Sequence, residues 1–205
     1  TGQKNFFSSG SLQPALAYLG YCPVGMAAST TVVVCPNLAG FKDDCFNSGY
    51  QMIVLKNANS AAAAPEMEMR DITDYVSATG TFTAVAFSSN VEASDIVIVI
   101  HNSVAAQAIA TGIADAGSDA DTLVDAVRTE ATGYFNGMSI LMLSGNATGL
   151  VRPITIYTLG SFEVRPAFPG AIAAGDRYLV LKDWHDFYGY DRIYFDSVLG
   201  IAGTV

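Results

Sequence analysis

Histidine and serine are the first residues to examine for catalysis, because a serine triad needs both of them beside a carboxylate. The two histidines are His101, in HNS, and His185, in DWHD, and neither belongs to a nucleophile elbow. The sequence also contains no P-loop, no Rossmann glycine pattern and no HExxH zinc motif. These patterns predict a protein that is not an enzyme.

Two acidic pairs have the residue type of glycosidase carboxylates, Asp43 with Asp44 and Glu66 with Glu68. Carboxylates so close in sequence are usually solvated charges of a loop, and we interpret both pairs in this way. The stretch DAGSDAD, residues 115–121, carries acids near the spacing of a calcium loop, but it lacks the glycine and the final glutamate of an EF-hand. Acids at the start of a helix, where the helix dipole favours them, are the preferred interpretation.

The three cysteines, Cys22, Cys35 and Cys45, all lie in the first quarter of the chain and form no CxxC pair. A zinc site needs about four soft ligands, and the two histidines are too far apart in sequence to complete one. Free thiols buried as small hydrophobic groups are the favoured interpretation, and one disulfide among the three is the alternative. We predict no metal and no other cofactor.

The composition is that of an apolar, acidic chain. Its 205 residues suit one large or two small domains, since a chain of this length buries roughly 70% of its extended surface. Hydrophobic residues make up 51% and charged residues 14%, which argues against disorder and predicts contact with other protein. A net charge of −9 argues against nucleic-acid and anionic-lipid binding. The aliphatic run IVIVI is far shorter than the roughly 20 residues of a transmembrane helix.

One pattern of residues occurs twice and predicts a duplicated β-module. Phenylalanine, asparagine and glycine lead into the apolar stretch YQMIVLK in the first copy and into MSILMLSG in the second. The motif R-x-I-T-x-Y then occurs at 70–75 and at 152–157, with the β-branched and aromatic residues typical of strands. A glycine turn and a phenylalanine follow in both copies and predict a hairpin.

The most specific match ends each copy. Phe87 stands eight residues before Asp95, Phe168 stands eight before Asp176, and each aspartate begins an apolar strand. The distance between matched positions falls from 89 to 81 residues along the module, so the loops differ while the order of strands is kept. We interpret the recurring polar and aromatic residues as fixtures of turns and sheet edges: Arg70, Tyr75 and Asp95 in the first copy, and Arg152, Tyr157 and Asp176 in the second.

A module of four or five short strands buries too little surface to be stable alone, so pairing two of them is the physical reason for duplication. We therefore predict a mainly β fold of two homologous small antiparallel β-barrel or sandwich modules, at 30–102 and 133–182, with a connecting helical segment at 103–132. Alanine-rich residues favour helix in that connector. The alternative for TLVDAVR is a leading strand, because TTVVVC stands at the equivalent place before the first module.

Two terminal segments lie outside the modules, an N-terminal arm at 1–29 and an aromatic C-terminal arm at 183–205. The aromatic residues of the second arm could close the bottom of a barrel or dock on a neighbouring chain, since aromatic side chains give a large contact area at low entropic cost. These candidate interaction residues are Trp184, Phe187, Tyr188, Tyr190, Tyr194 and Phe195.

The order of these elements, clearest from Gly133 to Leu181, resembles a β-module of virion structural proteins of tailed bacteriophages, including head-decoration and fibre-type proteins. The first copy departs from it at Ser94, where the second has Gly175, and by the insert NANSAAAAPEME before Arg70. The two copies cover a little over half of the chain. Because a fold does not determine a function, the resemblance is more specific for structure than for activity.

The resemblance implies a structural subunit located in the virion, either a capsid decoration or stabilising protein or another surface subunit. Such a subunit would form homo-oligomers and bind other virion proteins, such as a major capsid protein. The alternative is a secreted or cell-surface β-sandwich that binds glycans through Trp184 or builds a surface layer or sheath. An enzyme would instead need a cleft with converging carboxylates, for which Asp183 and Asp186 are the candidates.

Overall fold

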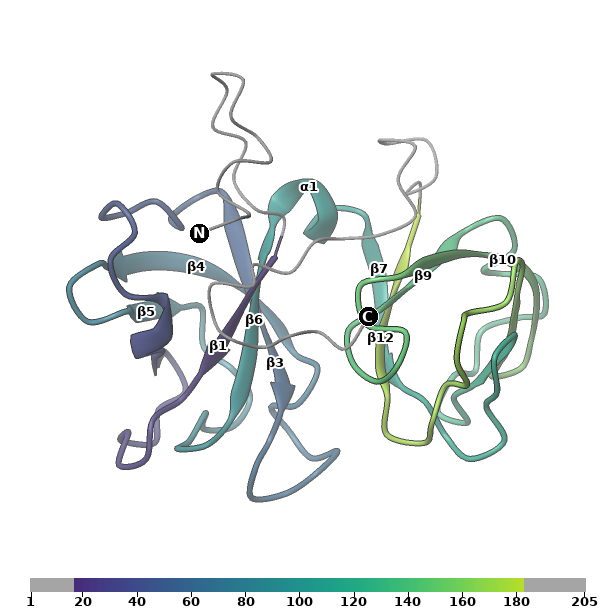
Figure 1. Ribbon diagram of the computed structural model, residues 1–205, viewed down its shortest axis with the longest axis horizontal. Helices are drawn as coiled ribbons and strands as arrows, with labels where there is room; N and C mark the ends of the chain where they lie inside the picture. Colours follow the sequence, from purple (N-terminus) through teal and green to yellow (C-terminus); the bar gives the residue numbers. More distant parts are fainter. Residues whose placement is uncertain (1–16, 183–205) are drawn as a thin grey trace. The chain divides into compact units, whose positions relative to one another are not determined.

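The computed structural model describes residues 17–182, which form two compact units, one ending at Ala105 and the next beginning at Ala106. Each unit is built on one six-stranded antiparallel sheet, and the predicted mainly β fold is thus confirmed (Figure 1). Within the described residues helix is confined to α1 (Asn102–Ala105) and the 3-10 helix η2 (Pro36–Leu38).

The first unit has its strands in the spatial order β1-β6-β3-β4-β5-β2. In that order their bounds are Ala17–Tyr21, Ile96–His101, Tyr50–Lys56, Met69–Val76, Thr81–Ala84 and Val32–Val34. The apolar runs IVIVIH and YQMIVLK form the central strands β6 and β3, which pair with each other along their length.

The second unit has the order β7-β12-β9-β10-β11-β8, which is the order of the first unit with each strand replaced by its counterpart six places later. Their bounds are Ala108–Ile113, Arg177–Leu181, Ser139–Met142, Val151–Thr158, Ser161–Val164 and Thr122–Val124. The repeated sequence pattern therefore corresponds to a repeated strand topology.

The predicted helical connector is reduced to the single turn of α1, and β7 and β8 occupy much of the segment instead. Pairing decides this outcome, because β7 completes a ladder along β12 and β8 along β11. Backbone groups that gain partners in a sheet override the weak helical preference of alanine. The alternative that TLVDAVR begins with a leading strand is confirmed, since β8 stands in the second sheet where β2 stands in the first.

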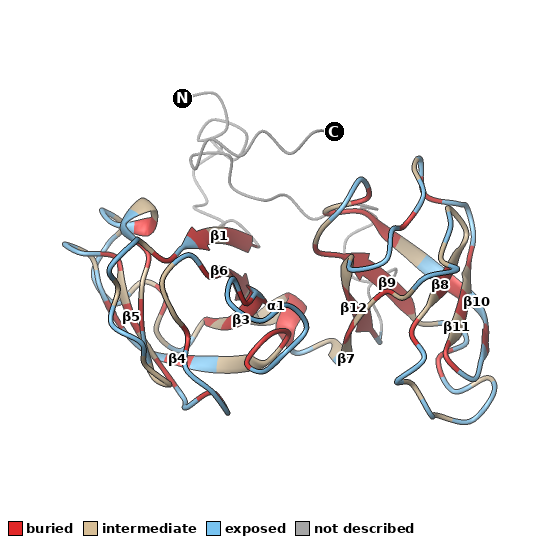
Figure 2. Ribbon diagram, turned by 90° about the horizontal axis from the view of Figure 1, so that it is seen from below, coloured by how far each residue is buried: buried red, intermediate tan, exposed pale blue. Residues whose placement is uncertain are grey.

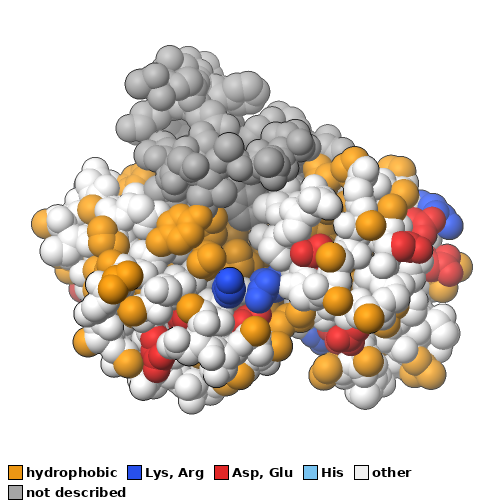
Figure 3. All heavy atoms as spheres, turned by 60° about the horizontal axis from the view of Figure 1, so that its bottom comes forward, with side chains coloured by type: hydrophobic (Ala, Val, Ile, Leu, Met, Phe, Trp, Pro, Cys, Tyr) orange, Lys and Arg blue, Asp and Glu red, His pale blue; other side chains and the backbone are white. Residues whose placement is uncertain are grey.

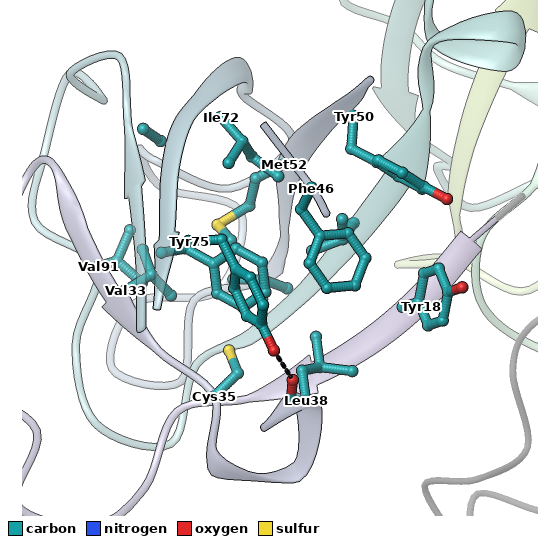
Figure 4. Packing of buried hydrophobic residues seen from close by; sticks show 14 of the residues in the cluster. Tyr18, Val33, Cys35, Leu38, Phe46, Tyr50, Met52, Ile72, Tyr75 and Val91 are labelled. Atoms are coloured by element: carbon teal, nitrogen blue, oxygen red, sulfur yellow. Dashed lines mark hydrogen bonds between the residues drawn. The ribbon is translucent and has the colours of Figure 1, made fainter. Parts of the chain in front are cut away.

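Each unit has its own aromatic core. In the first, Phe46 makes edge contacts with the rings of Tyr18, Tyr50 and Tyr75 at centroid distances of 4.8 to 5.2 Å (Figure 4). In the second, Phe135 contacts Tyr157 at 4.8 Å, the separation that Phe46 has from Tyr75. Edge-to-face packing at these distances adds about 0.5–1.5 kcal/mol per pair beyond area burial.

The central strands are buried along nearly their whole length, whereas exposed residues gather in the loops (Figure 2). On β6, Val97 and Val99 belong to the core of the first unit, and the intervening Ile98 is also fully buried. On β12, Tyr178 and Val180 belong to the second core, with Leu179 equally buried between them. This explains why both strands read as continuous apolar runs rather than as alternating ones.

Candidate functional site

The motif R-x-I-T-x-Y encodes a β-bulge in the first unit. Ile72 and Tyr75 are both buried although they are three residues apart, a spacing that would put them on opposite faces of a regular strand. The pairing of β4 with β5 shifts register between Ile72 and Asp74, which returns Tyr75 to the core face. The exposed Thr73 donates its hydroxyl to the Thr83 carbonyl across the bulge at 3.2 Å.

The second unit repeats this bulge. The register of β10 against β11 shifts between Ile154 and Ile156, and the buried Ile154 and Tyr157 are again three residues apart. Thr155 donates to the Glu163 carbonyl, also at 3.2 Å. The isoleucine, threonine and tyrosine of the motif thus have the same places relative to the bulge in both units.

The matched arginines fasten the start of this strand to the loop that follows the hairpin. The Arg70 guanidinium lies 5.7 Å from the ring centre of Phe87 and donates to the Ala86 carbonyl at 2.8 Å. The Arg152 guanidinium lies 5.5 Å from the ring centre of Phe168. Both are cation–π contacts that hold a half-buried charge against an aromatic face.

The matched aspartates organise the turn before the last strand of each unit. Asp95 is buried and accepts backbone N–H bonds from Glu92 at 2.9 Å and from Ala58 at 2.8 Å. Asp176 accepts the N–H of Ala173 at 2.9 Å, which is the same turn bond as that from Glu92. Both carboxylates thus fix the turn before the last strand, as the sequence analysis predicts for these matched residues.

In each unit, a side chain that follows one outermost strand bonds to the free edge of the other outermost strand. The side chain after β2 bonds to β1, and the side chain after β8 bonds to β7. Asn37, in η2, donates to the Leu19 carbonyl at 2.9 Å and accepts the N–H of Tyr21 at 3.1 Å, as a neighbouring strand would. In the second unit Arg128 donates to the carbonyl of Thr111, the counterpart of Leu19. Each of these bonds occupies a backbone group with which another chain could otherwise pair.

Ionisable side chains converge most closely in the second unit. The carboxylate of Asp125 is almost completely buried, and it accepts the Tyr178 hydroxyl at 2.6 Å and the Arg128 Nε–H at 3.4 Å. Arg128 also pairs with Glu130 at 3.3 Å, and Glu130 accepts the Tyr157 hydroxyl at 3.4 Å. We call these five residues the buried polar cluster.

The side chains of the buried polar cluster hydrogen-bond mainly to one another. Burial and the hydrogen bond to Asp125 raise the pKa of Tyr178, so this hydroxyl stays protonated as a donor. Burial opposes ionisation of Glu130, but hydrogen bonds and the charge of Arg128 outweigh it and lower the pKa. The hydrogen bonds of the cluster join the loop after β8 to β7, β10 and β12.

Sequence reasoning did not find this cluster, because its residues come from the loop after β8 and from the separate strands β10 and β12, and they match no motif. The first unit fills the corresponding place with Cys35 and Val97, which are apolar or nearly so. A signal was present in the repeat itself: Asp125 and Tyr178 interrupt two otherwise apolar positions of the module.

The interpretation of Glu66 and Glu68 as solvated loop charges is wrong. Glu66 is buried and accepts the backbone N–H groups of Asn57 at 2.9 Å and Ala62 at 3.1 Å, holding the long loop between β3 and β4. Glu68 pairs with Arg70 at 2.5 Å. Burial opposes its ionisation, but hydrogen bonds from Ser88 and the charge of Arg70 outweigh burial and lower its pKa.

The acids of DAGSDAD do not begin a helix, contrary to the preferred interpretation. Asp119 accepts the N–H groups of Asp121 at 3.0 Å and Thr122 at 2.8 Å, and this turn leads directly into β8. Asp115 accepts the N–H of Ala126 at 2.7 Å. No group of three or more metal-binding side chains occurs in residues 17–182.

His101 lies beside a serine, but the pair does not form a triad. The His101 Nδ1 atom is 2.8 Å from the Ser103 hydroxyl and accepts the Ser103 backbone N–H at 3.1 Å. Burial lowers the pKa of His101, and in the described part of the chain no carboxylate hydrogen-bonds to it. His185, Asp183, Asp186 and the aromatic residues of the predicted C-terminal arm lie outside the described residues.

Neither a protein-family model nor a curated protein matches the sequence. None of the helices between residues 17 and 182 is long and apolar enough to span a membrane.

Proposed function

We propose that the chain is a virion structural protein, a capsid decoration or stabilising subunit or another surface subunit that acts by self-assembly and by contacts with other virion proteins. The observation that carries the proposal is that R-x-I-T-x-Y forms the same bulge and the same arginine contact in both units. In each unit the motif provides a β-bulge, buried core residues and an arginine that packs on a phenylalanine ring. The two halves of the sequence thus produce the same sheet geometry. A repeated rigid sheet suits a subunit whose role is structural.

The covered sheet edges support assembly through side chains rather than through added strands. Besides the bonds to β1 and β7, Ser29 and Asp119 accept the first N–H of β2 and β8 respectively. Subunits of an extended lattice need such protection against uncontrolled strand pairing. Figure 3 shows one face of the molecule, on which hydrophobic side chains are spread among uncharged polar groups and acidic side chains occur in small groups.

The test is the mass of the protein in solution, measured by sedimentation velocity over a wide range of concentrations. We expect a stable oligomer or a larger lattice from the full chain. A variant that lacks residues 183–205 should dissociate if the C-terminal segment provides the contact. A variant that lacks residues 1–16 is the matched control, because it also retains all of residues 17–182.

A full chain that remains a folded monomer at every concentration would contradict the self-assembly on which the proposal depends. Binding of the same monomer to a panel of immobilised glycans, lost on Trp184→Ala, would then support the alternative of a secreted or cell-surface binding module. Because both measurements use the same folded protein, the two functions can be distinguished.

A further inference from the structure

Two of the three cysteines lie together in the first unit. Cys22 directly follows β1 and Cys35 directly follows β2, so the pair joins the two outermost strands of the sheet. Both are buried members of the same core, with 4% and 0% of their surfaces exposed. Both are free thiols, and they are close enough to hydrogen-bond to each other.

The surrounding backbone brings these thiols together. Gly20 allows the approach, since a Cβ atom added there would lie 2.7 Å from the Cys35 Sγ atom. The Cys22 N–H donates to the Asp95 carbonyl at 3.0 Å, and the Cys35 N–H donates to the Gly80 carbonyl at 2.8 Å. Asn37 ties η2 to β1 immediately beside them. Figure 4 shows the Cys35 side chain near Leu38 and Tyr75 in this core.

The second unit has no such pair. Ala114 replaces Cys22, with its N–H bonded to the Asp176 carbonyl, and Asp125 replaces Cys35, with its N–H bonded to the Gly160 carbonyl. In that unit Asp125 and Arg128 join the two edges by ionic hydrogen bonds. The first unit has two thiols at the place where the second has a polar link.

We propose that Cys22 and Cys35 form a disulfide that joins the ends of β1 and β2 when the protein meets a low-molecular-weight disulfide. One cysteine thiolate attacks the reagent and forms a mixed disulfide, which releases one thiolate of the reagent. The other cysteine then attacks the protein sulfur of the mixed disulfide and releases the second. Two protein thiols are oxidised, one reagent disulfide is reduced to two thiols, and two protons pass to the released thiolates.

Burial controls the rate of this reaction. The hydrogen bond that the Cys35 thiol donates to Cys22, followed by burial, raises the pKa of Cys35, so the reactive thiolate is scarce in the closed structure. Oxidation is therefore expected during folding or during local opening of β1. Cys45 is only partly buried and is the competing thiol that the experiment must remove.

The test uses the full-length Cys45→Ser variant, refolded from denaturant either in a buffer of reduced and oxidised glutathione or in dithiothreitol. Proteolysis without reduction and mass spectrometry then identify linked peptides, and thiols are counted after denaturation. We expect a Cys22–Cys35 linkage, no free thiol, and a midpoint of thermal unfolding roughly 10 °C higher than that of the reduced form. Dithiothreitol should reverse all three changes.

Two controls keep the outcome decisive. Cys22→Ala in the Cys45→Ser background should keep one free thiol and show no rise in the midpoint. The natural chain, alkylated at Cys45 in the native state before the same refolding, covers the case in which Cys45→Ser does not fold. Two free thiols, or glutathione adducts without a Cys22–Cys35 linkage, would overturn the proposal in either protein. The result does not depend on whether the chain self-assembles.

Discussion

The hydrogen bond between Tyr178 and Asp125 should be worth more than a neutral hydrogen bond in the same kind of core. Tyr178→Phe removes only the hydroxyl and leaves Asp125 bonded to Arg128 and to the Val127 N–H. Hydrogen bonds to charged groups contribute about 1.5–3 kcal/mol, so we expect Tyr178→Phe to lower the free energy of unfolding by about that amount.

Asp125→Ala should cost more, because it leaves Tyr178 and Arg128 without their buried acceptor. Removing one partner of a buried charged pair costs about 3–5 kcal/mol. The double variant should cost little more than Asp125→Ala alone, since the shared hydrogen bond is lost only once. The expected coupling energy between the two positions is therefore about 1.5–3 kcal/mol.

Urea unfolding followed by circular dichroism, at neutral pH, measures each term of this cycle. The first unit supplies a matched control, Tyr75→Phe, because the Tyr75 hydroxyl donates to a neutral group, the Leu38 carbonyl, at 2.7 Å. That variant should lose only about 0.5–1.5 kcal/mol. Costs that simply add in the double variant, or a larger loss at Tyr75 than at Tyr178, would refute the assignment of the cluster as a charge-assisted link.

Three further outcomes are expected in the same unfolding assay. Gly80→Ala should destabilise the protein by more than about 2 kcal/mol, because Gly80 has a positive φ and an added Cβ would meet backbone atoms. Gly40 also has a positive φ but has open space around it, so Gly40→Ala should cost only about 1 kcal/mol. Equal costs for the two variants would show that the close approach at Gly80 is unimportant. Thr155→Val should cost about 1 kcal/mol through loss of the bond across the bulge, and an unchanged midpoint would show that this bond adds nothing. Because the pKa of Glu68 is lowered in the folded state, its stabilisation is complete above its ordinary value of 4.5 and is lost as the pH falls below it. The difference in stability between the natural chain and Glu68→Gln should therefore shrink on acidification, and a constant difference would contradict this pKa shift.

Much of the fold could be predicted from the sequence, because the strands of the repeat can be recognised from short stretches of consecutive residues. The central strands β6 and β3 are apparent as apolar runs. Gly80 indicates the turn of the hairpin between β4 and β5. The repeated motif also predicts that both units have the same strand order, even when no contacts between strands are known. The edge strand β7 was missed because AIATGI has no strong strand signal of its own and becomes a strand only by pairing with β12.

Composition and short-range patterns were enough to predict two related β units, an acidic chain and apolar central strands. Three further features became apparent from the folded chain: the bulge at R-x-I-T-x-Y, the burial of Glu66, and the hydrogen bond between Cys22 and Cys35. The fold also assembled Asp125, Arg128 and Tyr178 into one cluster. The physical reason is that burial and hydrogen bonding depend on which strands become neighbours in space, and residues far apart along the chain carry no local mark of that neighbourhood.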